Sequence, residues 1–522
     1  FTAEYFYTPN KLIKKIETDI YGKKTVYFTN LQGQLILKKV QIDDNPLDDI
    51  TGWACNLYLY DLYGNLIHEI TPEGVKLIYE ESWDFNTGNG IDALNNYAFS
   101  YDYDAKNRLI SKKNPGGEWQ HFIYDKRDRL VATQDGNQAS KSIKEWTVNL
   151  YDEFDRNVVD FIYKSNQSRQ QLQTFFDGAD ETMYSVHGTY PYLNPFLDAD
   201  YNNENNFYTL KVYYYDDYSS SNVLNFDVTL ASSFSAVTNA LTIGKTNRTF
   251  GVSTGTYTRV LQSNTFLKAT TYYDEDGNVI QALEENILGG IDISTMQYHW
   301  NGALLAKNEK HGAPNKPFDN YRIHTTYSFD KLWRPKDVFK KFGTNPVRKI
   351  NTYEYNDIGQ LKKKTLSPDY ADHYSGIGIA GGGLESQDFS YNIQGMLVGV
   401  NKDYALKTGS YNKWQHFFGY FLGYDKTEGV FTGMRLNGQM KGQVWNTMGD
   451  DEQRKFEYTY DNAGRLLNAS FTQKIGSNWS NSFLDYSTGG YTGKVEYDLN
   501  GNLKSMSQKG FIYGQTSSVV ID

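Results

Sequence analysis

Several residue types and patterns are scarce in this chain of 522 residues, and each scarcity excludes a class of protein. The single cysteine, Cys55, cannot form an intramolecular disulfide, so stability must come from packing and backbone hydrogen bonds. No apolar run reaches the roughly 18 residues that a membrane-spanning helix needs. The eight histidines show no metal-ligand spacing. We therefore expect no catalytic residue, no cofactor-binding residue and no metal ligand.

Positive charge is also in the minority. The chain carries 52 Lys and Arg against 62 Asp and Glu, which gives a net charge of −10. Nucleic-acid-binding proteins gather Lys and Arg into patches, whereas the longest basic cluster here, 362–364, is typical of a solvated strand end. The expected partners therefore include no nucleic acid, and we expect no transmembrane segment in this chain.

Aromatic side chains, in contrast, are abundant. The chain has 44 Tyr, 29 Phe and 9 Trp, which make up 16% of its residues, yet its mean hydropathy is −0.63. A disordered chain lacks such side chains, because it buries too little apolar surface to offset its conformational entropy. A chain that is aromatic but polar overall indicates many short strands, with rings on one face and polar groups on the other.

One motif recurs at about ten places: an aromatic residue, Asp or Asn, two variable residues, Gly or another turn former, a polar residue and an aliphatic residue. The Asp or Asn side chain can accept from backbone N–H groups two residues on, and the turn former tolerates positive φ, so each copy predicts a hairpin turn. A second aromatic residue two positions earlier, as in Tyr58 and Tyr60, lies on the same face of the strand. An isolated hairpin is marginal in water, so successive hairpins must stack. The motif residues are Tyr60, Asp61, Gly64, Tyr103, Asp104, Tyr124, Asp125, Tyr151, Asp152, Tyr273, Asp274, Gly277, Tyr355, Gly359, Tyr391, Gly395, Tyr460, Asp461, Gly464, Arg465, Tyr497, Asp498 and Gly501, with less regular copies at Phe329–Asp330 and Phe28–Thr29.

The Tyr-Asp-x-x-Gly-Arg-Leu pattern of residues 460–466 and its relatives resemble the YD repeats of RHS proteins. That family includes bacterial RHS toxins, the cocoon subunits of toxin complexes and the teneurin shell. Longer blocks, such as 119–125, 272–281 and 388–395, resemble RHS proteins of Bacteroidetes in particular. The resemblance implies an all-β fold in which stacked β-hairpins coil into a spiral, hollow shell, open or partial over this length. It further implies a protein that is secreted or held on the bacterial cell surface, in that phylum often through the type IX pathway.

The density of repeats predicts how the chain is organised. A first repeat block spans 1–165, a repeat-poor, elaborated β segment spans 166–250, a second block spans 251–513, and 514–522 is a terminal strand leading into a missing region. Helix signals are sparse, and Trp445–Phe456 is the one candidate that we name. Alternating acidic side chains in the 198–204 loop could gather around a hard cation, although such a loop more often faces water.

Two formal matches to enzyme motifs lack the context that their chemistry requires. The glycines of 376–381 match a dinucleotide fingerprint but neither follow a parallel strand nor open an apolar-periodic helix. Gly251-x-Ser253-x-Gly255 matches a nucleophile elbow, but the residues after it are typical of a strand. We expect no enzyme.

Two functional hypotheses remain. In the first, the chain is the non-catalytic shell of a secreted RHS-repeat protein and encloses or shields its own C-terminal toxin or effector. In the second, it is a bacterial cell-surface adhesin or display scaffold for adhesion or gliding motility, exported by the type IX secretion system, with the secretion or outer-membrane machinery as a partner.

Overall fold

The structure, a computed structural model, describes residues 11–86, 88–178, 207–220, 222–232, 237, 239–370, 383–409, 411, 413–482, 484–489, 495–510 and 519–521. These residues fall into two compact units. The first unit contains the described residues of 1–108, 112–117 and 353–522, and the second contains those of 109–111 and 118–352.

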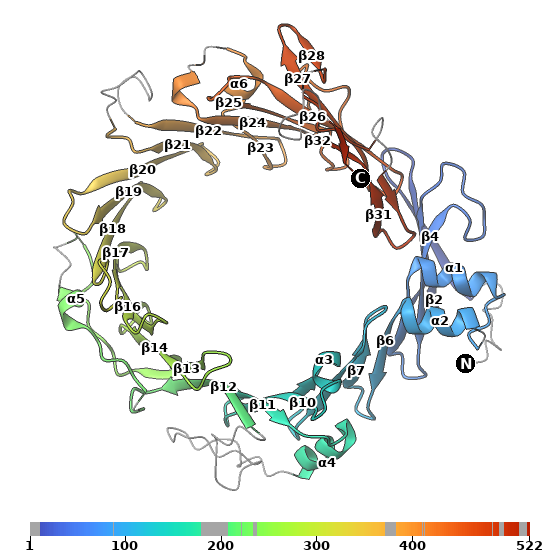
Figure 1. Ribbon diagram of the computed structural model, residues 1–522, viewed down its shortest axis with the longest axis horizontal. Coiled ribbons are helices and arrows are strands. Elements are labelled where there is room, and N and C mark those ends of the chain that lie inside the picture. The colour runs from blue at the N-terminus through green and yellow to red at the C-terminus, as the bar shows by residue number, and fades with distance from the viewer. Residues whose placement is uncertain are drawn as a thin grey trace. The chain divides into compact units, whose positions relative to one another are not determined.

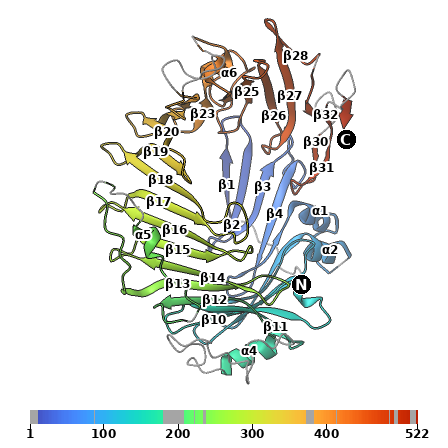
Figure 2. The same cartoon turned by 60° about the vertical axis from the view of Figure 1, so that its left-hand side comes forward.

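The second unit is a long antiparallel meander. Each of its strands pairs with the strand that precedes it and the strand that follows it in the chain, from β8 to β19. Figure 2 shows these strands as successive ribbons. They are β8 (Trp119–Tyr124), β9 (Leu130–Gln134), β10 (Glu145–Tyr151), β11 (Asn157–Lys164), β12 (Phe207–Asp216), β13 (Thr249–Arg259), β14 (Phe266–Tyr273), β15 (Val279–Glu285), β16 (Ile291–Tyr298), β17 (Leu304–His311), β18 (Tyr321–Phe329) and β19 (Pro335–Phe342).

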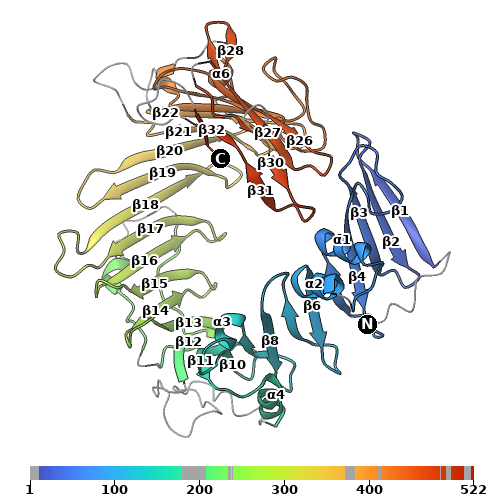
Figure 3. The ribbon, with the colours of Figure 1, turned by 45° about the vertical axis from the view of Figure 1, so that its right-hand side comes forward.

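The first unit contains two stretches of the same kind of meander. In one, β1 to β6 pair in chain order (Figure 3), and in the other β21 to β27 do so. The strands of the first stretch are β1 (Leu12–Thr18), β2 (Lys24–Asn30), β3 (Leu35–Gln41), β4 (Trp53–Tyr60), β5 (Leu66–Ile70) and β6 (Ala98–Tyr103). The later strands are β21 (Leu361–Leu366), β22 (Glu385–Tyr391), β23 (Leu397–Val400), β24 (Phe418–Gly423), β25 (Gly442–Thr447), β26 (Arg454–Tyr460), β27 (Leu466–Ile475), β28 (Asn478–Ser480), β29 (Thr488–Gly489), β30 (Val495–Tyr497), β31 (Leu503–Met506), β32 (Gln508–Gly510) and β33 (Val519–Ile521). Two further strands, β7 (Leu109–Lys113) and β20 (Arg348–Tyr355), include residues assigned to both units.

Helices cover the sheet only locally. Helices α1 and α2 lie over β4 to β6 of the first unit (Figure 1), where Ile70, Val75, Ile78 and Ala93 are fully buried. The helices are α1 (Pro72–Glu80), α2 (Gly88–Asn96), α3 (Gly136–Ala139), α4 (Arg169–Gly178), α5 (Val228–Ser232), α6 (Lys402–Leu406) and the 3₁₀ turn η2 (Lys413–Gln415).

The largest core cluster belongs to the second unit. Trp146, Val148 and Leu150 alternate with half-buried residues along β10, which is the period of two expected for a strand with one face against a core. Leu172 and Phe176 of α4 complete this cluster.

The structure confirms the all-β prediction, since stacked antiparallel hairpins account for most of the described residues. The helix predicted over Trp445–Phe456 is wrong. Trp445 lies in β25 and pairs across the sheet with Tyr420 on one side and Arg454 on the other. The cation loop 198–204 and the glycines of 376–381 lie outside the described residues. Gly251–Gly255 lies within strand β13, which continues to Arg259 through the residues that were predicted to form a strand.

Candidate functional site

The repeat turns share one hydrogen-bonding arrangement, which is clearest at Asp125. Its Oδ1 accepts from the backbone N–H groups of Arg127 and Arg129, both at 2.9 Å. Its Oδ2 accepts from Nε of Arg129 at 2.6 Å. A single carboxylate therefore holds the turn together from inside and joins the two strands that the turn connects.

Other residue pairs reproduce this arrangement with different chemistry. Asp61 pairs with Asn65, whose Nδ2 donates to Oδ2 at 2.9 Å. In the Asn356 copy the direction is reversed, because Asn356 Nδ2 donates to Oε1 of Gln360 at 2.9 Å. An ionised partner is thus one of several solutions for the same turn.

Two of the turn carboxylates, Asp104 and Asp330, have a pKa below the ordinary value. Burial raises the pKa of Asp104, but hydrogen bonds from Arg108 and Lys106 and the Arg108 charge outweigh burial, so the pKa lies below its ordinary value. At the more exposed Asp330, the N–H group of Arg334 is the main cause of a lowered pKa. The negative charge of these turns therefore persists throughout the neutral range.

The turn also requires one residue in the left-handed backbone conformation and one extra residue in the returning strand. Gly64 has φ 90°, and the equivalent Asn107 and Asp128 both have φ 61°. In the Tyr460 copy, Tyr460 pairs with Leu466 although Thr459 pairs with Asn468, so the returning strand has one extra residue, a β-bulge. The fifth position and the bulge together set the direction in which the next strand leaves.

The motif tyrosine links each hairpin to the hairpin before it. Every predicted motif Tyr is the last residue of its strand. In nine repeats of the described residues the phenol hydroxyl donates to a backbone carbonyl at or near the start of the returning strand in the preceding repeat, at 2.7 to 3.1 Å. We call these bonds the tyrosine links; they are Tyr60 to Leu35, Tyr124 to Leu109, Tyr151 to Leu130, Tyr215 to Asn157, Tyr273 to Ser253, Tyr298 to Val279, Tyr391 to Leu361, Tyr460 to Met440 and Tyr497 to Leu466.

Burial favours the donor form of these tyrosines. It raises the pKa of Tyr151, Tyr273, Tyr298 and Tyr460 above the ordinary value of a phenol. The hydroxyl therefore carries its proton across the working pH range.

Several arginines of the motif also reach forward to the next repeat. Arg129 Nη1 donates to the Asp152 carbonyl at 3.0 Å, and Arg465 Nη1 donates to the Asp498 carbonyl at 2.9 Å. Arg156 Nη1 and Nη2 donate to the two carboxylate oxygens of Asp216, at 2.8 and 2.7 Å. The linked repeats are thus joined to the preceding repeat through Tyr, and these three copies are joined to the following repeat through Arg.

Sequence reasoning missed two copies and misplaced a third. Tyr215–Asp216 belongs to the segment that we described as repeat-poor, and its tyrosine link and its partner Arg156 identify it. At Tyr298, a His replaces the motif Asp. In the first copy Asn30, not Thr29, holds the turn by accepting from the N–H groups of Gln32 and Gln34, so the copy begins one residue later than predicted.

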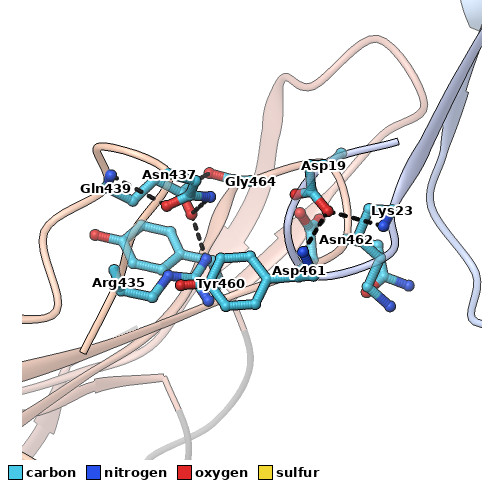
Figure 4. A pocket seen from close by; sticks show the side chains of 11 residues that line it. Asp19, Lys23, Arg435, Asn437, Gln439, Tyr460, Asp461, Asn462 and Gly464 are labelled. Carbon is cyan, nitrogen blue, oxygen red and sulfur yellow. Dashed lines mark hydrogen bonds between the residues drawn. The ribbon is translucent and has the colours of Figure 1, made fainter. Parts of the chain in front are cut away.

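Within the first unit, residues near the start of the chain contact the last complete repeats. The guanidinium of Arg435 lies 4.9 Å from the ring centre of Tyr21 and 5.0 Å from that of Tyr460. Figure 4 shows Arg435 beside Tyr460. The Tyr21 hydroxyl accepts from the N–H group of Leu436 at 2.8 Å. These residues and their neighbours line a cavity of about 470 Å³.

Further contacts extend this surface. We call the contacts of residues 21–73 with residues 435–500 in the first unit the terminal seam. Asn462 Nδ2 donates to the Ile42 carbonyl and to Asp44, both at 3.1 Å. The Lys23 ammonium, 2.9 Å away, and the Asn462 amide hold the pKa of Asp44 below its ordinary value.

The seam continues at helix α1. Glu73 accepts from the N–H group of Leu499 at 3.0 Å, while its own N–H donates to Asn500 Oδ1 at 2.9 Å. The terminal seam is therefore held by charged and polar groups that pair with one another.

The remaining functional features are limited. Across the described ranges, no group of three His, Cys, Asp or Glu side chains lies close enough to hold a metal ion. In the same part of the chain, no helix is both long enough and apolar enough to cross a membrane. The fold and its turns define a class, that of an all-β protein built from repeated hairpins whose turns carry the structural chemistry.

No protein-family model matches the chain, and no curated protein matches it. Among solved structures, the Photorhabdus luminescens Tc holotoxin pore with a substitution in TccC3 is similar at 10% identity and a TM-score of 0.46, over 95% of this chain and 22% of that one. The crystal structures of TcdB2-TccC3-Cdc42 and TcdB2-TccC3-TEV are each 11% identical, with TM-scores of 0.29 and 0.30, over 94% and 93% of this chain. The chain covers 22% and 20% of those two solved chains, about a fifth of their length.

Proposed function

We propose that this chain is the non-catalytic shell portion of a secreted YD-repeat protein and that it encloses or shields a polypeptide that follows it. The observation that carries this proposal is the series of tyrosine links, which fasten nine repeats to their predecessors. The resemblance to the RHS family supplies the expectation that the enclosed polypeptide is a toxin or effector.

The physical basis of the proposal is stiffness. A hairpin strip that was held only by its backbone ladder could slide and twist at each junction, whereas the tyrosine links fix neighbouring hairpins at nine junctions of the described chain. A stiff sheet of this kind confines a polypeptide by excluded volume, and it needs no reactive group to do so. In the turns and in the terminal seam, the polar groups hydrogen-bond to one another. This pairing supports a structural role rather than a catalytic one.

The proposal is tested on the full-length protein that contains this chain. Limited proteolysis followed by mass spectrometry measures the rate of cleavage after residue 522 and compares it with the rate for the same downstream segment expressed alone. We expect the segment to be cleaved at least tenfold more slowly within the intact protein.

A shell variant shows whether the protection comes from the repeats. Asp125→Ala, which removes the acceptor at the centre of one repeat turn, should accelerate cleavage of the downstream segment. Equal cleavage rates in the intact protein and in the isolated segment would contradict the proposal. So would a full-length protein with no polypeptide beyond this chain.

A further inference from the structure

The contacts of the terminal seam follow one order along the chain. On the early side they come from three connections, which join β1 to β2 (19–23), β3 to β4 (42–52) and, through helix α1, β5 to β6. In that order, these connections contact the one between β24 and β25, the one between β26 and β27, and the one between β30 and β31. Connections of the early strands and of the late strands therefore match one to one, in the same direction along the chain.

The seam depends on side chains rather than on a backbone ladder. A side-chain atom is the donor or the acceptor in each of the five hydrogen bonds described across it, and these side chains belong to Tyr21, Glu73, Asn462 and Asn500. The strands on each side are joined by backbone ladders, as β1 is to β2 and β26 is to β27. A surface side-chain bond competes with water and contributes little net free energy, whereas opening a ladder breaks several bonds together. The seam is therefore weaker than the strand pairs on either side of it.

The early side of the seam is joined within itself. The Lys23 ammonium donates to Asp44 at 2.9 Å, which connects the first two of its three connections. The Tyr79 hydroxyl donates to Asp49 Oδ2 at 3.0 Å, which connects the second to helix α1. The three early contact points are thus held to one another as well as to their own strands.

The late side is joined in the same way. Gln439 Nε2 donates to the Gly464 carbonyl at 2.9 Å, and Arg465 Nη1 donates to the Asp498 carbonyl at 2.9 Å. These two bonds connect the three late contact points in chain order. Because each side is held together internally, the two sides separate at all three contacts or at none.

We propose that the terminal seam is a latch, a contact that opens and closes as one unit while the strands on either side stay paired. Opening the latch separates the early strands of the first unit from its late strands without unfolding either group. The use of the latch rests on the proposed function: it gives an enclosed polypeptide a way out that leaves the shell folded.

Two backbone N–H groups report directly on the latch, because each donates to a side chain across the seam. Leu436 donates to the Tyr21 hydroxyl at one end, and Leu499 donates to Glu73 at the other end. Hydrogen exchange of this chain, measured by mass spectrometry on peptides that contain one of these groups, gives the opening of each end. Tyr21→Phe removes the acceptor for Leu436 and keeps the ring beside Arg435. We expect both ends to exchange about fivefold faster in this variant, since one hydrogen bond of the closed state is lost.

A second variant and a matched control accompany this test. Asn462→Ala removes the two bonds at the middle contact and should accelerate exchange at both ends. Tyr63→Phe is the control, because Tyr63 is 84% exposed at a repeat turn outside the seam, and it should change neither end. The latch is overturned if Tyr21→Phe accelerates Leu436 alone or accelerates neither group. It is also overturned if peptides of β2 and β3 accelerate as much as the two reporters.

The use of the latch is tested on the full-length protein. Asp44→Cys and Asn462→Cys place two thiols across the seam, where the native side chains lie 3.1 Å apart, and bismaleimidoethane joins them. The thiol of this chain, Cys55, is buried and does not compete. Because a bridged latch cannot open, we expect limited proteolysis of the downstream segment to slow by at least about threefold, and Asn462→Cys alone with the same reagent to have no effect. Equal rates with and without the bridge would overturn this use of the latch. The shell proposal would still stand if both forms were cleaved more slowly than the isolated segment.

Discussion

The turn pair Asp104 and Arg108 allows a quantitative test of the repeat chemistry. Arg108 donates to Asp104 twice, from its N–H at 3.0 Å and from Nε at 2.7 Å. Another repeat of the same chain uses Asn356 and Gln360 at the equivalent positions. We predict that Asp104→Asn and Arg108→Gln each destabilise the turn, and that the double variant, which reproduces the Asn–Gln pair, recovers much of the loss.

The size of the effect follows from the bonds. Asp104→Asn keeps the acceptor for the two N–H groups but loses one bond to a charged partner, which costs about 2 kcal/mol. Arg108→Gln loses the same bond from the other side, at a similar cost of about 2 kcal/mol. Side-chain exposures of 14% and 19% leave little screening by solvent. Independent effects would add to about 4 kcal/mol, whereas a restored neutral bond brings the double variant to between about 1 and 2 kcal/mol.

The assay must be local, because a chain with two compact units does not unfold in a single two-state step. Native-state hydrogen exchange of peptides covering residues 98–113 reports the opening free energy of this turn. Asp102→Asn is the matched control, since Asp102 is exposed in the same strand and should change that free energy by less than about 0.5 kcal/mol. Additive single effects, or a cost for Asp104→Asn no larger than the control, would refute the reasoning.

Three further predictions concern the links, the thiol and acid. Tyr151→Phe should lower the opening free energy of strands β9 and β10, measured by hydrogen exchange, by about 1 kcal/mol. Tyr63→Phe, at an exposed turn position, is the control and should leave that free energy unchanged. Equal effects of the two substitutions would contradict the role of the tyrosine links. Cys55 is buried, and burial raises the pKa of its thiol to about 11. The native protein at pH 8 should therefore resist alkylation by iodoacetamide, whereas the urea-unfolded protein should react. Rapid labelling of the native chain would show that the site opens. The lowered pKa of Asp104 stabilises the fold above its unfolded pKa of about 3.9, and this contribution is lost as pH falls through the folded value. The opening free energy of residues 98–113, measured by hydrogen exchange between pH 7 and pH 3, should therefore fall less steeply for Asp104→Asn than for the unmodified chain, and parallel curves would contradict the assignment.

The turns were predictable from the sequence because their chemistry is local. In the Asp125 copy, the acceptor and its donors Arg127 and Arg129 lie within five residues, so spacing alone reveals the hairpin. The tyrosine links were not predictable, because each joins residues of different hairpins, as in Tyr60 and Leu35, and nothing in the local pattern specifies the partner.

The errors have equally specific causes. Helix α1 has a usable signal in Thr71–Pro72, with Pro at the first helical position, but its stability comes from burial of Val75 and Ile78 beneath neighbouring elements. Trp445 was placed in a helix because cross-strand pairing, which decides its structure, leaves no mark on its own segment. The Tyr298 copy was missed because His299 occupies the position of the Asp by which the other copies were recognised.

The tyrosine links bear on a problem that alternating burial leaves unsolved. A strand that slips by one residue turns its apolar side chains to solvent, so the core itself rejects that error. A strand that slips by two residues keeps the same face inward, so burial of its apolar side chains does not oppose that slip. The hydroxyl of Tyr151 reaches only the carbonyl of Leu130, and a two-residue slip would carry it about 6.6 Å away from its acceptor. At the nine linked junctions the phenol thus favours one strand alignment over its two-residue neighbours, which lets near-identical hairpins follow one another without exchanging partners.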